Sequence, residues 1–223
     1  MNIYNVLGVS IEDKSLRQQL EFAFGSLENK SLNTVCLLDT ELLMKIKDDE
    51  TAKAAVMAMD MLVAGSTELL KSGGITSKSR FKEVESGLFL QGFLKKLGHD
   101  KKKIFLIGSS QEELKHLREV LLSIENRLTF FGSATYGNDD TSADGVVNNI
   151  NSVLPDVIIS MAESPKQELL VSENRAMVNA AMWVCLQPGN LEIAQGHMGR
   201  MKKFINYLEN RIFRRTVKQF DGQ

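Results

Sequence analysis

The sequence predicts an α/β protein with a Rossmann-like, mainly parallel sheet of about six strands and helices on both faces. Six short apolar runs rich in Val, Ile and Leu lie near residues 35, 61, 105, 130, 158 and 184, and stretches with helical periodicity separate them. Strands that alternate with helices form parallel sheets with right-handed crossovers. No internal repeat interrupts this series.

Size and composition describe an ordinary globular protein. Of the 223 residues, 25% are charged and 43% are hydrophobic, which suits one large core. Cys36 and Cys185 lie in strand-like runs, so we interpret them as small buried hydrophobes in a reducing cytoplasm. We expect neither a signal peptide nor a transmembrane helix, because no basic-then-apolar leader and no apolar run of about 18 residues occurs.

The first part of the chain begins with a strand or hairpin over residues 3–11, with Gly8 at its turn. Ser15 and Gln18 form a capping-box pattern that opens a helix. A strand follows over residues 34–38, and then a short helical stretch over residues 40–47.

Asp48 and Asp49 are candidate caps for the next helix, and residues 60–63 form the second strand. Residues 71–80 contain two adjacent glycines and few large apolar side chains, so we predict a mobile loop there.

The central part holds a helix over residues 88–97, a charged turn over 98–103 and a buried strand over 104–107. A strand over residues 128–131, a polar loop over 132–145 and a helix over 143–153 then complete the pattern.

Gly108 and Ser109 follow the buried strand and precede a helix with Ser110 and Glu113 as a capping box. A strand, a Gly–Ser turn and a helix start can present backbone N–H groups to a phosphate. Most α/β units have such a turn with nothing bound, so both interpretations stay open.

The stretch from Leu154 to Gly196 carries the two last strands, over residues 157–160 and 182–186, each with a Pro- or Gly-bearing loop behind it. Loops at the carboxyl ends of parallel strands bind ligands in open α/β sheets. The loop SPKQE, residues 164–168, either caps a helix through Ser164 and Pro165 or presents Lys166, Gln167 and Glu168 to a ligand.

The C-terminus is basic. Between Arg200 and Phe220 there are seven basic residues and one acid, so this segment carries +6 and the rest of the chain about −7. We divide the chain into an α/β domain, residues 1–199, and a basic amphipathic helical appendage, residues 200–223. The appendage either packs on the body or docks on an anionic membrane or a partner, and its membrane-docking candidates are Arg211, Arg214, Arg215 and Lys218.

Common catalytic motifs are missing. There is no Walker loop, no dinucleotide-binding glycine motif, no nucleophile elbow and no metal-ligand spacing, so we predict no metal site and no bound cofactor. The histidines His99, His116 and His197 are isolated, and only His197 lies near the expected site. Nothing favours nucleic acid as a partner, because the basic tail lacks base-stacking aromatics on a sheet.

The order of these landmarks resembles the WecG/TagA/CpsF family of bacterial glycosyltransferases. YNVLGVSI resembles that family's opening strand, IFLIGSS its "VFLLGG" segment, and LPDVIIS followed by SPKQE its "PD" strand and "G-x-PKQE" motif. LQPGNLEIAQG resembles "GVGGAFDFLAG", and the tail resembles the family's membrane-directing appendage.

The resemblance implies transfer of an N-acetylmannosamine-type sugar from a UDP donor to an undecaprenyl-diphosphate-linked sugar in the biosynthesis of cell-envelope polysaccharides. It implies metal-independent chemistry by a cytoplasmic protein that is peripheral at the inner face of the membrane, and a homo-oligomer fits the family's habit. Among the residues that the resemblance assigns to substrate binding are Lys166, Gln167, Glu168, Gly189, Glu192, Gly108 and Ser109.

The sequence departs from the family at the catalytic positions. The family's threonine corresponds to Leu37, its catalytic aspartate to Gly65, and the glycines before PKQE to residues 161–163. A glycine cannot accept a proton. Asp39 is therefore the candidate for a relocated base, whereas we interpret Asp60, at the start of a strand, as structural.

Two hypotheses follow. The chain is either a divergent active glycosyltransferase, or a catalytically inactive relative, a pseudoenzyme that binds a partner glycosyltransferase, a nucleotide or a lipid-linked intermediate in the same pathway.

Overall fold

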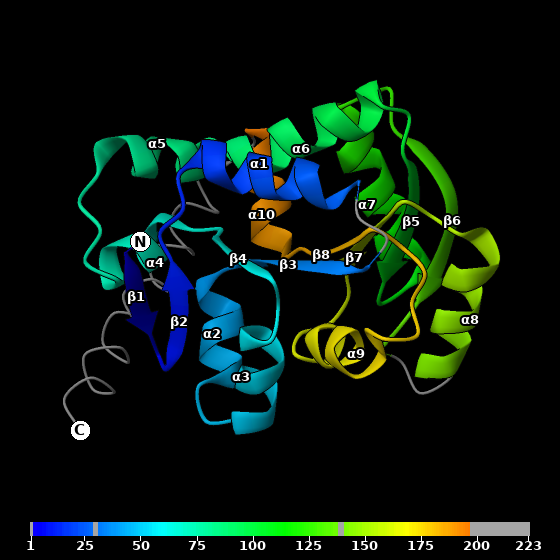
Figure 1. Ribbon diagram of the computed structural model, residues 1–223, viewed down its shortest axis with the longest axis horizontal. Helices are drawn as coiled ribbons and strands as arrows, with labels where there is room; N and C mark the ends of the chain where they lie inside the picture. The colour runs from blue at the N-terminus through cyan, green and yellow to red at the C-terminus, as the bar shows by residue number, and fades with distance from the viewer. Residues whose placement is uncertain (1, 29–30, 138–140, 197–223) are drawn as a thin grey trace.

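The computed structural model confirms the predicted fold. It describes residues 2–28, 31–137 and 141–196 (Figure 1). Within these residues, six strands form one sheet in the order β4-β3-β8-β7-β5-β6, and every neighbouring pair is parallel. The strands are β3 (Asn33–Leu38), β4 (Met61–Ala64), β5 (Lys103–Gly108), β6 (Thr129–Thr135), β7 (Val157–Met161) and β8 (Met182–Cys185).

Helices cover both faces of the sheet, as predicted. The upper group in Figure 1 comprises α1 (Leu16–Ser26), α5 (Lys78–Glu85), α6 (Leu88–His99), α7 (Gln111–Ile124) and α10 (Pro188–Gln195). The lower group comprises α2 (Thr40–Ile46), α3 (Glu50–Met57), α8 (Ala143–Val153) and α9 (Lys166–Asn174). A short helix, α4 (Thr67–Ser72), follows β4.

Each face of the sheet has its own apolar core, because neighbouring residues of a strand point to opposite faces. In β7, Ile158 packs in one core, whereas Val157 and Ile159 pack in the other. Cys36 and Cys185 are both fully buried free thiols, in agreement with their interpretation as small core residues.

The first segment is a separate antiparallel hairpin of β1 (Ile3–Val6) and β2 (Val9–Glu12), turned at Leu7 and Gly8. Gly8 has φ +86°, which glycine adopts readily. Val6, Val9 and Ile11 bury their side chains in the lower core, so the hairpin closes that core beyond β4.

Three predicted boundaries differ from the structure by more than one residue. The strand near residue 130 continues to Thr135, because the register between β5 and β6 shifts after the pair Ile104–Phe130 and β5 goes on to pair with β6 from Gly132 onward. The predicted mobile loop over residues 71–80 includes the end of α4 and the start of α5. The helix that we expected to end at Leu97 reaches His99.

Asp60 joins three elements at the amino end of the sheet. Its carboxylate accepts hydrogen bonds from the backbone N–H of Thr34 at 2.7 Å, from the Thr34 hydroxyl at 2.9 Å and from the Arg175 guanidinium at 2.7 and 2.8 Å. Partial burial opposes ionisation, but these hydrogen bonds outweigh it and hold the pKa of Asp60 below its usual range. This geometry agrees with a structural role for Asp60, at the end of the sheet away from the ligand-binding edge.

The strands β3 and β8 are neighbours in the sheet although they are far apart in the sequence, and the loops that follow them lead to opposite faces of the sheet. After β3 the chain enters α2 below the sheet, and after β8 it enters α10 above it (Figure 1). In open α/β sheets, a crevice forms at the carboxyl ends of two such strands, and ligands bind there. The fold therefore places its candidate site between the loops that follow β3 and β8.

Candidate functional site

Asp39 and Gly189 lie beside each other where β3 and β8 end, at the place where the topology predicts a crevice, which we call the β3–β8 crevice. Asp39 follows β3 and caps α2, with its Oδ1 accepting the backbone N–H of Leu42 at 2.8 Å. Its Oδ2 lies 3.8 Å from the point where a Cβ on Gly189 would sit. A carboxylate and a half-buried glycine thus meet where the topology predicts a ligand.

Burial raises the pKa of Asp39 to about 6, although the hydrogen bond from the Leu42 N–H works in the opposite direction. A carboxylate with this pKa is mostly ionised at pH 7 and yet basic enough to accept a proton. This pKa is compatible with the predicted role of Asp39 as a base, which stays a prediction.

The SPKQE loop forms a buried polar junction with Gln187, which we define as Ser160, Ser164, Gln167, Glu168 and Gln187. The Gln167 side chain accepts the Ser160 hydroxyl at 2.9 Å and donates to the carbonyl oxygen of Leu186, at the end of β8, at 3.1 Å. The Ser164 hydroxyl donates to Glu168 Oε1 at 2.9 Å, and Gln187 Nε2 donates to the same oxygen at 3.0 Å. The junction therefore joins the carboxyl ends of β7 and β8.

This geometry corrects the helix-cap interpretation of SPKQE. The helix α9 begins at Lys166, and no side chain caps its first turn. The Ser164 hydroxyl binds the Glu168 carboxylate instead, because that buried group has the greater need of a donor.

Gln167 and Glu168 are fully buried, so both lie behind the edge of the sheet and not on its surface. Their side chains set the positions of the loops at the crevice. Direct contact with a ligand, as the resemblance implies for both, stays a prediction.

Glu168 has an unusual environment. Burial raises its pKa to about 7, and the hydrogen bonds from Ser164 and Gln187 offset only part of that effect. Its Oε2 is buried and has no hydrogen-bond partner among the described residues. The carboxyl group therefore keeps its proton to a higher pH than an exposed glutamate does.

Lys166 lies at the surface, at the start of α9. Its ammonium group donates to the carbonyl oxygen of Gly137 at 2.9 Å and forms an ion pair with Glu163 at 2.8 Å. Glu163 stands where the resembling motif has glycine, so any anion that approached Lys166 would also meet this carboxylate.

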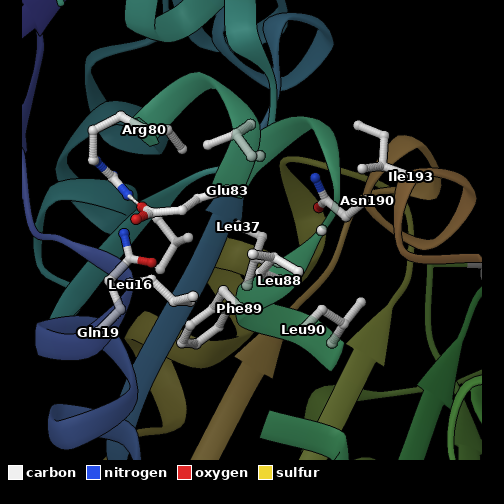
Figure 2. Close-up of a pocket in the computed structure, with 15 residues that line it drawn as sticks. Leu16, Gln19, Leu37, Arg80, Glu83, Leu88, Phe89, Leu90, Asn190 and Ile193 are labelled. Atoms are coloured by element: carbon white, nitrogen blue, oxygen red, sulfur yellow. Dashed lines mark hydrogen bonds and ion pairs between the residues drawn. The ribbon is translucent and has the colours of Figure 1, made fainter. Parts of the chain in front are cut away.

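A pocket lies above the carboxyl ends of β3 and β4, and we call it the Gly65 pocket (Figure 2). It spans about 380 Å³ with its open mouth included, but its interior leaves only about 30 Å³, room for about two water molecules. Leu37, Val63, Leu88 and Phe89 are among its apolar walls. Its polar lining residues are Gln19, Arg80, Glu83 and Asn190.

Asn190 occupies the space above Gly65. A Cβ on Gly65 would lie 2.1 Å from Asn190 Nδ2 and 2.7 Å from the carbonyl oxygen of Leu38. Asn190 is held there because its Oδ1 accepts the backbone N–H of Gln187 at 2.8 Å. No side chain at position 65 fits while Asn190 keeps this place.

Buried polar atoms without partners gather at one edge of the sheet. Within the described residues they are Ser66 Oγ, Glu168 Oε2 and Asn190 Nδ2, which follow β4, β7 and β8 respectively. An unpaired buried polar atom costs about 1–3 kcal/mol, and such atoms are concentrated where function requires them. This distribution supports a binding site at the carboxyl edge.

The turn after β5 is less suited to a phosphate. The backbone N–H of Ser109 donates to the Glu113 carboxylate at 2.9 Å, and Glu112 adds a second acid to the first turn of α7. A Cβ on Gly108 would approach Leu114 to 3.2 Å, so this glycine serves the packing of α7 on the sheet. An anion would have to displace Glu113.

Comparison with known proteins identifies the family. The model of the Glycosyl transferase WecG/TagA/CpsF family matches residues 4–218, nearly the whole chain. The chain belongs to this glycosyltransferase family. A search of the curated proteins found no match.

The two residues at which the sequence departs from the resembling motifs lie together in the structure. Leu37 and Gly65 both line the Gly65 pocket, where the resemblance would place the family's threonine and catalytic aspartate. In this chain the pocket holds an apolar side chain and the Asn190 amide at those two places. Asp39 lies outside the pocket lining, on the α2 side of the crevice.

The other candidate site residues lie either on α10 or outside the described residues. Glu192 is half-buried on α10, two residues after Asn190. His197 and the membrane-docking candidates Arg211, Arg214, Arg215 and Lys218 lie outside the described residues, as does the appendage.

No helix of the described part is both long and apolar enough to cross a bilayer. The same part contains no group of three His, Cys, Asp or Glu side chains that could hold a metal.

Sequence reasoning missed Asn190, Gln187 and Arg80. One signal was available for Asn190, because it follows Gly189 directly in a loop that we expected to bind a ligand. Arg80 and Gln187 gave no such signal, since their partners Asp13 and Glu168 are 67 and 19 residues away.

Glu168 makes stability depend on pH. Because burial raises its pKa from 4.5 to about 7, the folded state keeps a proton that the unfolded state loses as pH rises from 4.5. The free energy of unfolding therefore falls through this window, by up to about 3 kcal/mol from this group. Glu168→Gln cannot ionise, so its stability relative to the wild type should grow by about 2–3 kcal/mol from pH 5 to pH 8 in urea unfolding. Exposed Glu112→Gln is the control, and equal pH profiles for wild type and Glu168→Gln would contradict the assignment.

Gly65 and Asn190 should be energetically coupled. Gly65→Ala should destabilise the fold by about 1–3 kcal/mol, because the new methyl group overlaps the Asn190 amide. In the double variant with Asn190→Ala, part of that loss should return, giving a coupling energy of about 1 kcal/mol in a double-mutant cycle. Gly25→Ala is the matched control, since nothing lies within 4 Å of a Cβ there. Additive effects of the two changes would show that the Asn190 amide does not occupy this space.

Proposed function

We propose that this protein transfers an N-acetylmannosamine-type sugar from a UDP donor to an undecaprenyl-diphosphate-linked sugar in the biosynthesis of cell-envelope polysaccharides. The observation that carries the proposal is the pair of Asp39 and Gly189 at the β3–β8 crevice, in a chain of a glycosyltransferase family. The crevice supplies a glycine for the donor and a carboxylate for the acceptor.

In this mechanism, Asp39 is the general base. The acceptor hydroxyl oxygen forms a bond to the anomeric carbon of the donor sugar while the bond from that carbon to the UDP oxygen breaks. The hydroxyl proton passes to the Asp39 carboxylate, whose raised pKa of about 6 suits this transfer. Turnover should accordingly rise with pH as Asp39 loses its proton near pH 6.

The remaining candidates supply binding. Gly189 admits the donor to the first turn of α10, and Lys166 offers a cation at the neighbouring loop. The basic appendage, with Arg211, Arg214, Arg215 and Lys218, would hold the protein to an anionic inner membrane surface, where the lipid-linked acceptor resides.

A second candidate function is that of a binding subunit without catalysis, acting with a partner glycosyltransferase. One observation favours it: the Asn190 amide fills the space beside Gly65, which is the position that the resemblance aligns with the family's catalytic aspartate. In this case the crevice would bind a nucleotide or a lipid-linked sugar and release it unchanged.

Calorimetry with UDP and UDP-N-acetylmannosamine, followed by a transfer assay with a lipid-diphosphate acceptor, separates the two. We expect wild-type turnover, and a loss of at least about 100-fold in Asp39→Asn with UDP affinity unchanged, because the amide keeps the cap on α2 but accepts no proton. Asp60→Asn is the control and should keep full UDP affinity and turnover in the protein that remains folded. Binding without turnover would establish the binding subunit, and no UDP binding at millimolar concentration would contradict the transferase.

A further inference from the structure

The strand β6 forms an open edge of the sheet. It stands last in the strand order, and its only strand partner among the described residues is β5. Figure 1 shows β6 at one end of the sheet, with α7 above it and α8 below. An open edge offers unpaired N–H and C=O groups to another extended chain.

The regular part of this edge begins after Phe131. The register shift leaves Phe131 without a partner on β5, and such bulges keep an edge from pairing. Over residues 132–135 the ladder is regular. The backbone N–H of Tyr136 donates to a carbonyl oxygen of β5 at 2.9 Å, so the alternation of a parallel ladder turns the N–H and C=O groups of Ser133 and Thr135 outward.

A groove with a volume of about 410 Å³ lies between α7 and β6. Its apolar lining residues are Leu106, Leu114, Phe130 and Phe131. Lys115 and Arg118 also line it, both are exposed, and no acid of the described residues does so. Glu112 and Glu119 belong to the same helix, but neither lines the groove. The groove therefore carries positive charge beside the open edge.

Two aromatic rings border the groove, each with a cation over one face. The Arg118 guanidinium carbon lies 5.4 Å from the centre of the Phe130 ring, and the Lys103 ammonium lies 5.5 Å from the centre of the Phe131 ring. Phe131 is 54% exposed, although it is a large apolar side chain. A segment with both acidic and apolar side chains would match this surface, whereas a nucleobase would find one face of each ring already covered.

We propose that the open edge of β6 and the groove beside α7 bind an acidic, extended segment of a partner protein. Its backbone pairs with Ser133 and Thr135 as an additional strand. Its acids lie against Lys115 and Arg118, and an apolar side chain covers Phe131. Because β5 and β7 separate β6 from β8, the bound strand leaves the β3–β8 crevice open. The proposal is independent of what that crevice binds.

Two other occupants fit the charge of the groove less well. In a two-fold pairing of β6 with β6 of a second copy, the same patch meets itself, so Lys115 and Arg118 of both copies would come together. The C-terminal appendage carries +6 between Arg200 and Phe220 and would add positive charge to a positive groove. An acidic segment is the occupant whose charge complements the groove.

Fluorescence anisotropy on the full-length protein tests the charge, with a labelled synthetic peptide of alternating Glu and Val as the probe. Arg118→Glu should weaken binding by about tenfold or more, because it reverses a charge that faces the acids of the peptide. A peptide with Lys in place of Glu should bind the double variant of Arg118→Glu and Lys115→Glu more tightly than the wild type. Lys78→Glu is the matched control, because Lys78 is an exposed cation on α5, at the opposite side of Figure 1.

Ser133→Pro tests the strand pairing. Proline at this position removes an outward N–H and leaves the ladder with β5 intact, so the protein should stay folded and bind the acidic peptide about tenfold more weakly. In the wild type, the peptide should slow the amide hydrogen exchange of Ser133 and Thr135. Circular dichroism and thermal unfolding confirm that each variant is folded.

No binding of the acidic peptide at millimolar concentration, equal affinity for the acidic and basic peptides, or wild-type affinity in Arg118→Glu would overturn the proposal. Unchanged exchange at Ser133 and Thr135 would do the same. Tighter binding of a single-stranded oligodeoxythymidylate than of the acidic peptide would assign the groove to a nucleic acid instead. A dimer in sedimentation that Ser133→Pro dissociates would assign the edge to a second copy.

Discussion

The carboxyl edge of the sheet depends on hydrogen bonds to the polar groups that are buried where β7 and β8 end. The Gln167 amide makes two of these bonds, since it accepts the Ser160 hydroxyl on β7 and donates to the Leu186 carbonyl oxygen after β8. The Glu168 carboxylate likewise accepts hydrogen bonds from the Ser164 hydroxyl and the Gln187 amide. Because these contacts hold both loops, Gly189 and Asn190 take fixed places at the start of α10. The crevice beside Asp39 and the pocket above Gly65 both follow from that placement.

The junction gives the SPKQE segment a structural role. Gln167 and Glu168 are core residues of the edge, and replacing either would leave buried partners unpaired. Leu37 and Gly65 instead line a pocket, where their side chains determine what the pocket can hold.

The sequence predicted the fold well because its signals are local. Alternating apolar runs and caps such as Ser15, Asp49 and Ser110 gave the elements and their order. The carboxyl-edge location of the site follows from topology alone. The predicted boundaries were wrong where tertiary contacts determine them, as in β6, which pairs with β5 through a register shift.

Contacts between residues that are far apart in the sequence could not be predicted from it. A helix cap was one of the two roles predicted for the loop of Ser164, but its hydroxyl donates to Glu168, because the burial of that carboxyl group cannot be seen in the sequence. Asn190 fills the space beside Gly65 although the two residues are 125 positions apart, and no sequence spacing predicts this contact.

A crystal structure with bound UDP-N-acetylmannosamine tests most directly whether the β3–β8 crevice is the sugar-nucleotide site. We expect the diphosphate beside Gly189 and the anomeric carbon within reach of an acceptor hydroxyl that contacts Asp39. A ligand held at the turn of Gly108 and Ser109 instead, with the crevice empty, would contradict it.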